Sequence, residues 1–255
     1  LTSGRNGAPA GCSDSTRGLF CGGNGPIQDT IEYITMATTG NALDFGNLIA
    51  VFEHGAGSAS SPTRGVIAGG NSPSITNAIQ YVTISTLGNA ADFGDLNAVR
   101  KGGGVGSSSN AVRGIFSGGY DPSVTDTIEF VTIASLGNGV EFGDMVYNGR
   151  DGGAASNATR GIIFGGGDPA VNNISYITIA TLGNTADFGD LDNLKANGGA
   201  CSSSTRAVYG GGLAPGNKNN IEYIEILTTG DALDFGDLVA AGHNLRAFSN
   251  AHGGL

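Results

Sequence analysis

Residues 111–119 read Ala111-Val112-Arg113-Gly114-Ile115-Phe116-Ser117-Gly118-Gly119, a short run rich in β-forming residues that ends in a glycine pair. An Arg followed five residues later by Gly-Gly occurs five times in the chain. A fixed period of this length is typical of proteins built from repeated supersecondary units. The five arginines, separated by 47, 49, 47 and 46 residues, are Arg17, Arg64, Arg113, Arg160 and Arg206.

A second marker keeps the same period. The triplet Asp/Glu-Phe-Gly occurs once in each repeat, and its acidic residues are Asp44, Asp92, Glu141, Asp187 and Asp234. Because two independent markers share one period, we infer five repeats in a single domain over residues 1–255. The expected repeat cores are residues 16–48, 63–96, 112–145, 159–191 and 205–238.

Each repeat contains strand patterns and no convincing helix. In the third repeat, residues 111–117, 127–133 and 140–145 are three runs with the β-branched and aromatic residues that strands favour. The Gly/Ser stretch at 102–109 leads into the Arg and is expected to hold a fourth strand. Four short strands in about 45–50 residues are typical of one blade of a β-propeller. The sequence therefore predicts an all-β propeller of four-stranded blades, with five blades.

Closure of the ring has two interpretations. There are five cores but six copies of the linking segment, because residues 249–253 echo residues 109–114. Either one copy is surplus in a closed five-bladed ring, or the chain is cut from a longer array. We expect the five-bladed ring, since an open arc would leave sheet faces exposed.

Aromatic residues are expected to fill the space between blades, because the chain has no Trp. The recurring candidates are the Phe of the Asp/Glu-Phe-Gly triplet and an aromatic residue of the preceding strand. Aromatic side chains bury about 150–250 Å² each, so these rings would supply the main packing mass. The residues of the preceding strand are Tyr33, Tyr81, Phe130, Tyr176 and Tyr223.

Composition excludes several function classes. Of the 255 residues 46 are Gly but only 7 are Pro, which excludes collagen. The formal net charge of −10 makes binding to nucleic-acid phosphates improbable, and the chain lacks an apolar run long enough to insert into a membrane. Many Gly, Ser and Thr residues with few charges favour strands and turns over helices.

The repeat resembles the kelch repeat in its Gly-Gly doublet after a β run, in the aromatic-bearing strand that follows, and in its period near 50. It departs from kelch in having Phe where kelch repeats usually carry Trp. Three sequence motifs of the repeat are similar to those of kelch-like repeats in structural proteins of marine and cyanobacterial tailed phages. These motifs are Thr-Arg-Gly, Ile-Glu-Tyr-Ile-Thr-Ile and Asp-Phe-Gly-Asp-Leu. That resemblance implies a virion component, such as a tail, fibre or capsid-surface protein.

The Arg and the Asp/Glu that recur in every repeat have two interpretations. The five arginines form either a ring of cations for an anionic ligand or a structural clamp with the five carboxylates, in their own or the next blade. Arg makes bidentate pairs with carboxylates, and both groups recur once per repeat, so we expect the clamp.

The sequence favours neither a metal site nor a disulfide. Acid pairs such as Glu141/Asp144 suit calcium only if the strand bends at the intervening Gly, so no metal site and no cofactor are expected. The histidines His54, His243 and His252 share no repeat position. Cys12 and Cys201 share one, but we expect free thiols because equivalent positions on neighbouring blades are usually too far apart for a disulfide.

Asymmetry between repeats lies mostly in the loops at 71–78, 120–127, 167–174 and 213–220. We expect a non-enzymatic interaction module of a virion that presents these loops to other virion proteins or to a host surface. A propeller that binds host glycans is the alternative, and an enzyme acting on glycans is a third, requiring two carboxylates about 5–10 Å apart. The candidate ligand-binding residues are Tyr120, Asp121, Asp168, Asn172, Asn217 and Asn219.

Overall fold

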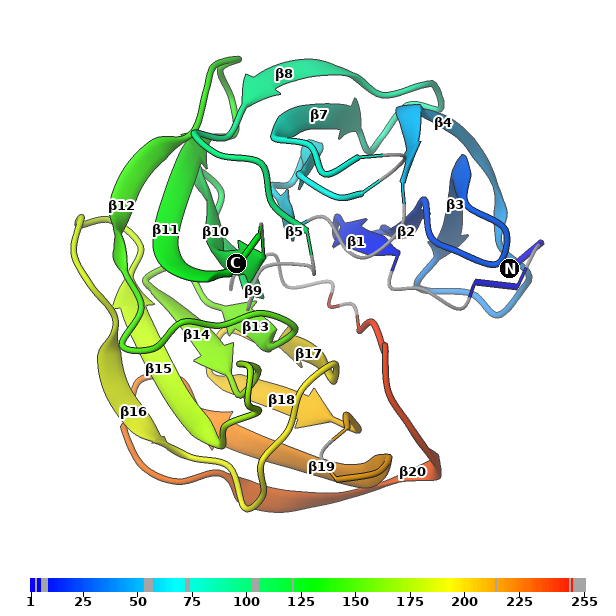
Figure 1. Cartoon of the computed structure of the whole chain (residues 1–255). Helices are drawn as coiled ribbons and strands as arrows, with labels where there is room; N and C mark the ends of the chain where they lie inside the picture. The colour runs from blue at the N-terminus through cyan, green and yellow to red at the C-terminus, as the bar shows by residue number, and fades with distance from the viewer. Residues whose placement is uncertain are drawn as a thin grey trace.

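The computed structural model consists of strands joined by turns (Figure 1). It describes residues 1–2, 4–5, 9–52, 57–71, 74–101, 106–120, 122–213, 215–247 and 249. Within these residues there are twenty strands and no helix. The strands form five antiparallel sheets of four, each in sequence order across the sheet.

Each sheet is one blade, numbered here in chain order. Blade 1 comprises β1 (Ala10–Ser13), β2 (Arg17–Cys21), β3 (Gln28–Thr35) and β4 (Leu43–Phe52). Blade 2 comprises β5 (Gly57–Ser60), β6 (Arg64–Ala68), β7 (Ala78–Thr83) and β8 (Ala91–Asp95). Blade 3 comprises β9 (Gly106–Ser109), β10 (Arg113–Tyr120), β11 (Val124–Thr132) and β12 (Val140–Asp144). Blade 4 comprises β13 (Gly153–Ser156), β14 (Arg160–Phe164), β15 (Asn173–Thr178) and β16 (Ala186–Asp190), and blade 5 comprises β17 (Gly199–Ser202), β18 (Arg206–Gly210), β19 (Lys218–Glu225) and β20 (Leu233–Gly242).

The blades are arranged around a common centre (Figure 1). The first strand of each blade is innermost and the fourth is at the rim. The prediction of an all-β propeller with five four-stranded blades is therefore confirmed.

The Gly/Ser stretches form the innermost strands. Residues 106–109 make β9, the first strand of blade 3, while residues 102–105 lie outside the described residues. Neighbouring innermost strands contact each other from β1 through to β17. Small side chains suit this position because several backbones converge there.

Serines connect the innermost strands. The Ser109 N–H donates to the Ser156 Oγ at 3.1 Å, and the Ser156 N–H donates to the Ser202 Oγ at 3.2 Å. Ser13 and Ser60 take the same place in blades 1 and 2. Each hydroxyl thus satisfies a backbone group that the inner edge of a sheet would otherwise leave unpaired.

Phenylalanine supplies the packing between blades. Phe45 lies in one cluster with Ile67, Val82 and Ile84 of blade 2, and it also meets Tyr33 of its own blade edge to face. Phe45, Phe93, Phe142 and Phe188 are only 2 to 3% exposed. The expected location of these rings between blades is confirmed for four of the five repeats; the fifth, Phe235, is 55% exposed.

The glycine of the Asp/Glu-Phe-Gly triplet is required by close approach of two blades. The ladder between β11 and β12 shifts register at Ile128/Glu129, opposite Phe142-Gly143. Gly143 has a φ of +154°, and a Cβ there would overlap the carbonyl of Gly183 in blade 4. The bend that the sequence analysis required at this Gly is therefore present as a β-bulge.

The sixth linking segment has a place of its own. The Ser249 hydroxyl donates to the Ser202 carbonyl, and the Ser249 carbonyl accepts from the Ser13 hydroxyl at 2.9 Å. Ser249 therefore lies between β17 and β1 as a sixth member of the inner ring and is not surplus. Farther out, a groove of about 730 Å³ lies between blade 5 and blade 1, where the ribbons of Figure 1 stand apart, so the closed ring expected from the sequence is open at this interface.

Candidate functional site: the loop face

One face of the propeller carries the variable loops. Because the strands alternate in direction, the connections from second to third strand and from fourth to the next first strand open on the same side. We call this side the loop face. It carries described parts of all four loops that the sequence analysis singled out.

Tyr120 is the centre of a mixed cluster on the loop face. The Lys101 Nζ lies 5.6 Å and the Arg150 Cζ 5.1 Å from the centre of the Tyr120 ring. Main-chain hydrogen bonds between Lys101 and Tyr120 join the linker to the end of β10. Arg150, in the linker between β12 and β13, also donates to Asp168 at 2.8 Å. Asp168 lies in the loop between β14 and β15 of blade 4. The cluster therefore combines an aromatic ring, two cations and a half-exposed carboxylate.

A small polar pocket lies beside this cluster. Its volume is about 280 Å³, and Val124, one of its lining residues, pairs with Tyr120 in the ladder. Hydroxyl, amide and carboxyl groups dominate the lining, which includes Asn97, Ser123, Thr125, Asp126, Thr127 and Asn148. A pocket of this composition suits a small polar group better than an apolar one.

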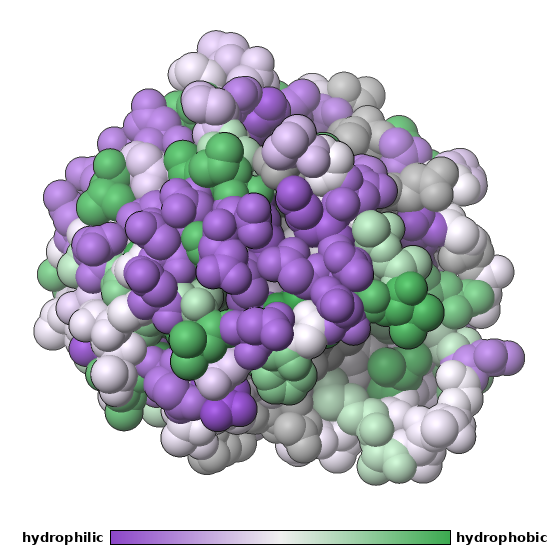
Figure 2. All heavy atoms as spheres, turned by 90° about the horizontal axis from the view of Figure 1, so that it is seen from below, coloured by the Kyte–Doolittle hydropathy of each residue, from purple (hydrophilic) through white to green (hydrophobic). Residues whose placement is uncertain are grey.

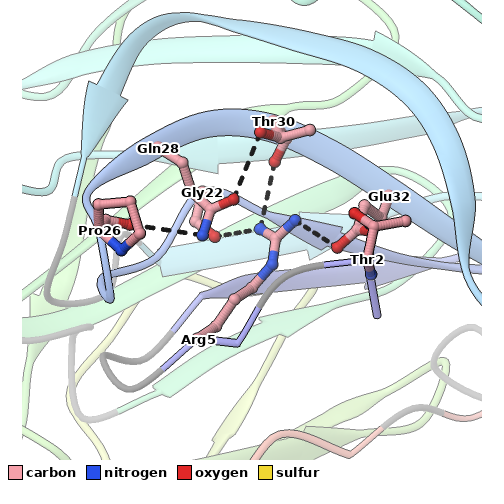
Figure 3. Close-up of polar contacts among 7 residues, drawn as sticks. All are labelled: Thr2, Arg5, Gly22, Pro26, Gln28, Thr30 and Glu32. Carbon is pink, nitrogen blue, oxygen red and sulfur yellow. Dashed lines mark hydrogen bonds and ion pairs between the residues drawn. The ribbon is translucent and has the colours of Figure 1, made fainter.

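Below the loop face, buried ion pairs fix three linkers. Arg100 contacts Glu129, and Lys195 contacts Glu222, with these side chains at most 7% exposed. In Figure 3 the Arg5 guanidinium reaches the Glu32 carboxylate and the carbonyls of Gly22 and Thr30. The Arg5–Glu32 distance is 2.6 Å. Each cation comes from a linker, and each carboxylate comes from the third strand of the blade that follows that linker. The ion pair therefore fixes the linker to that strand.

The environment of Glu32 shows how such a carboxylate stays charged. Burial would raise the pKa of Glu32, but hydrogen bonds from Thr2 and Arg5 outweigh burial and lower that pKa. The Thr2 N–H donates to Glu32 at 2.7 Å. Buried charges of this kind are stable only when paired and hydrogen-bonded.

Sequence reasoning missed these pairs. They occur in blades 1, 3 and 5, while Gln80 and Ser175 replace the Glu in blades 2 and 4. The signal was present, because each of the three Glu residues follows the paired cation by 27 to 29 residues. It is weak because it skips alternate repeats.

The recurring arginines clamp neighbouring blades through a carbonyl. Arg113 donates to the carbonyl of Ile179 in blade 4 at 2.8 Å and lies 4.5 Å from the centre of the Phe130 ring. Arg17, Arg64 and Arg160 make the same two contacts with Ile84, Ile133 and Ile226 and with Tyr33, Tyr81 and Tyr176. Arg206 keeps the ring contact, 4.3 Å from the centre of the Tyr223 ring, but its guanidinium pairs with Glu225 of its own blade at 2.8 Å.

The recurring carboxylates do not take part in that clamp within the described residues. They lie on the rim strands next to the Phe of the triplet, which is buried in blades 1 to 4, and because side chains alternate along a strand, they point outward. Asp187 accepts a hydrogen bond from Asn173 at 3.0 Å. All five, Asp44, Asp92, Glu141, Asp187 and Asp234, are exposed.

The other candidate loop residues do not gather at one site. Asn172 donates to the Leu191 carbonyl at 3.3 Å, which is a structural contact. Asn217 lies 2.9 Å from His243, in blade 5, and Asn219 is exposed nearby. Asp121, like His54 and His252, lies outside the described residues.

Neither a metal centre nor a disulfide is seen in the described part of the chain. No group of three or more His, Cys, Asp or Glu residues there is arranged to hold a metal ion. Cys12, Cys21 and Cys201 are free thiols. Burial raises the pKa of Cys201. Among the described residues, no helix is long and apolar enough to cross a membrane.

The fold and the radial arrangement define the class of protein, a β-propeller. Comparison with solved structures agrees: the structure of YjhT superposes with a TM-score of 0.78 over 95% of this chain and 87% of that chain. Sequence identity is 10%, so the likeness concerns the fold alone. No protein-family profile and no curated protein sequence matches the chain.

Proposed function

We propose that this chain is a non-enzymatic interaction module that binds a partner protein through its loop face. The observation that carries the proposal is the cluster of Tyr120, Lys101, Arg150 and Asp168. Tyr and Arg are, with Trp, the residues enriched where protein interfaces concentrate their binding energy. Here they stand on a rigid ring of sheets, which preorganises them for binding.

The partner is proposed to be another virion protein. Support comes from the similarity of the repeat sequence to the repeats of structural proteins of tailed phages. Five near-equivalent blades, each offering the same scaffold and a different loop, suit a rigid component that joins others in an assembly.

Catalysis normally needs unlike groups that converge in one pocket. Below the loop face, Arg100, Lys195 and their Glu partners are instead committed to buried ion pairs.

A glycan is the second candidate ligand, favoured by the polar pocket beside Tyr120. An aromatic ring next to hydroxyl and amide groups is suited to stack on a sugar and to hydrogen-bond its hydroxyls. The pocket volume of about 280 Å³ suits a single small sugar unit.

Site-specific photocrosslinking separates these candidates. A photoreactive phenylalanine analogue placed at position 120 should crosslink one virion protein when the chain is assembled in particles, and an added Arg150→Ala should weaken that crosslink. The control position is 227, an exposed residue in the turn between β19 and β20 on the opposite face. Equal crosslinking from both positions, or absence of the chain from purified particles, would refute the proposal. Saturable binding on a glycan array that Thr125→Ala abolishes would favour the glycan instead.

A further inference from the structure

Four of the blade-to-blade interfaces share one set of hydrogen bonds. Between blades 3 and 4, Arg113 donates to the Ile179 carbonyl at 2.8 Å, and the Gly183 N–H donates to the Phe142 carbonyl at 2.8 Å. The Asp144 N–H donates to the Asn184 side chain at 3.0 Å. The same three bonds recur between blades 1 and 2, 2 and 3, and 4 and 5. Every blade therefore has a leading face that carries the Arg and Phe and a trailing face that receives them.

The leading face of blade 5 is left without a receiving blade. Phe235 is 55% exposed, whereas its four counterparts are 2 to 3% exposed. Gly236 has no neighbour within 4 Å of an added Cβ, unlike Gly143. Arg206 pairs with Glu225 of its own blade, at 44% side-chain exposure.

The trailing face of blade 1 is the complementary half. Ile34 and Met36 are half-buried, whereas their counterparts Val82 and Ile84 in blade 2 are 2% and 0% exposed. Gly40 and Asn41 stand where Gly88 and Asn89 of blade 2 bond to blade 1. Within the described ranges, no hydrogen bond of the Gly40 N–H or the Asn41 side chain is seen.

A groove of about 730 Å³ separates the two faces. Ile34 and Met36 line it from blade 1, Arg206 and Val208 from blade 5, and Ser249 from the inner ring. Figure 2 shows the molecule from below relative to Figure 1, and hydrophobic residues gather at the right of its mainly polar surface. The end of β20 and the groove lie on the same side in Figure 1. We call the space between the two faces the open wedge.

We propose that the open wedge is the seat of a sixth blade, formed by one more copy of this repeat joined to the chain at Ser249. Ser249 already holds the innermost position, between Ser202 and Ser13. The occupant therefore brings only the second, third and fourth strands.

The two faces specify the chemistry of that occupant. Toward blade 5 it offers a main-chain carbonyl to Arg206, a Gly N–H to the Phe235 carbonyl, and an Asn or Asp side chain to the Asp237 N–H. Toward blade 1 it offers its own Arg to the Met36 carbonyl and its own Asp-Phe-Gly to Gly40 and Asn41. Only a copy of the repeat carries both halves, and this interface would continue one already made four times in the molecule.

The test replaces the residues after Ser249 with a copy of residues 203–242. This copy is chosen because it follows Ser202, the residue equivalent to Ser249. A second variant carries a copy of residues 157–192, which follow Ser156, so that the result does not depend on one extension folding. The matched control carries the first extension with the copied Arg206→Ala and Phe235→Ala. The readouts are amide exchange at Gly40, the labelling rate of the Cys201 thiol, which lines the groove, and the sedimentation mass.

Filling the wedge should slow exchange at Gly40 and labelling of Cys201 by about tenfold or more, while the control stays close to the parent. The proposal is overturned if neither extension changes either rate. It is also overturned if the parent chain sediments as a dimer in which Gly40 is already protected, because the occupant would then be a second copy.

Discussion

The hydroxyl of Ser156 donates to the carbonyl of Ser109 at 2.7 Å, while the N–H of Ser109 donates to that same hydroxyl at 3.1 Å. One side chain thus satisfies both backbone groups of a residue in the neighbouring blade. Ser202 makes the same double contact with the carbonyl and with the N–H of Ser156. The inner ring is therefore held by hydroxyls where larger side chains would not fit.

Ser156→Ala should lower the free energy of unfolding by roughly 1–3 kcal/mol, because it leaves two backbone groups of Ser109 without their partner. Urea unfolding followed by circular dichroism measures the change. Ser15→Ala, at an exposed turn position, is the control and should change stability by less than about 0.5 kcal/mol. Equal effects of the two substitutions would show that the serine ring does not stabilise the fold.

Phe142 and Phe235 occupy the same repeat position with different burial, 3% and 55% exposed. Phe142→Ala should cost about 3–5 kcal/mol of unfolding free energy, as expected for a large core residue. Phe235→Ala should cost less than about 1 kcal/mol, because most of its ring already faces the open wedge. A large loss of stability in Phe235→Ala would mean that the wedge is filled in solution.

Glu222 and Glu225 compare a buried ion pair with an exposed one in the same strand. Glu222→Gln removes the charge that faces the fully buried Lys195 and should cost about 3–5 kcal/mol. Glu225→Gln acts on the exposed pair with Arg206 and should cost less than about 1 kcal/mol. Thermal denaturation of both variants at one pH measures the difference. Similar melting temperatures would contradict the role of Lys195–Glu222 in fixing the linker.

The fully buried Tyr209 and the partly buried Tyr147 predict a loss of stability at high pH. Burial raises the pKa of Tyr147 and of Tyr209 above the ordinary value. The folded state therefore keeps its phenolic protons where the unfolded chain, with a pKa near ~10, releases them. Their contribution is complete below that pH and is lost as the pH rises above it.

The measurement is the free energy of unfolding between neutral pH and strongly alkaline pH, for the parent and for Tyr209→Phe. Tyr209→Phe should be less stable at neutral pH, because the Gly198 N–H loses its acceptor at 3.1 Å. It should also lose less stability on going to alkaline pH. An unchanged pH dependence would show that Tyr209 is not protected from ionisation by the fold.

The period of Arg and Asp-Phe-Gly was enough to predict the five blades, because each marker sits at a fixed backbone feature. The Phe is a packing residue between blades, and its Gly makes the bulge where a Cβ would not fit. Such requirements repeat with the blade and are visible in one sequence.

The partner of Arg113 was not predictable in the same way. A backbone carbonyl, here that of Ile179, has no sequence signature, so sequence analysis predicted a carboxylate as the acceptor. The Arg5–Glu32 pair was missed because only alternate blades carry it. The Tyr120 cluster joins four segments that only the fold brings together; sequence analysis identified Tyr120 and Asp168 but neither Lys101 nor Arg150.

The claim that blades are joined by one repeated contact set, with one side left open, is tested most directly by amide hydrogen exchange of the parent chain. The account predicts strong protection of Gly88, Gly137, Gly183 and Gly230, whose N–H groups donate to the Phe carbonyl of the preceding blade at 2.8 to 2.9 Å. Gly40, at the same repeat position in blade 1, should exchange rapidly. Protection of Gly40 equal to that of the other four would contradict the account.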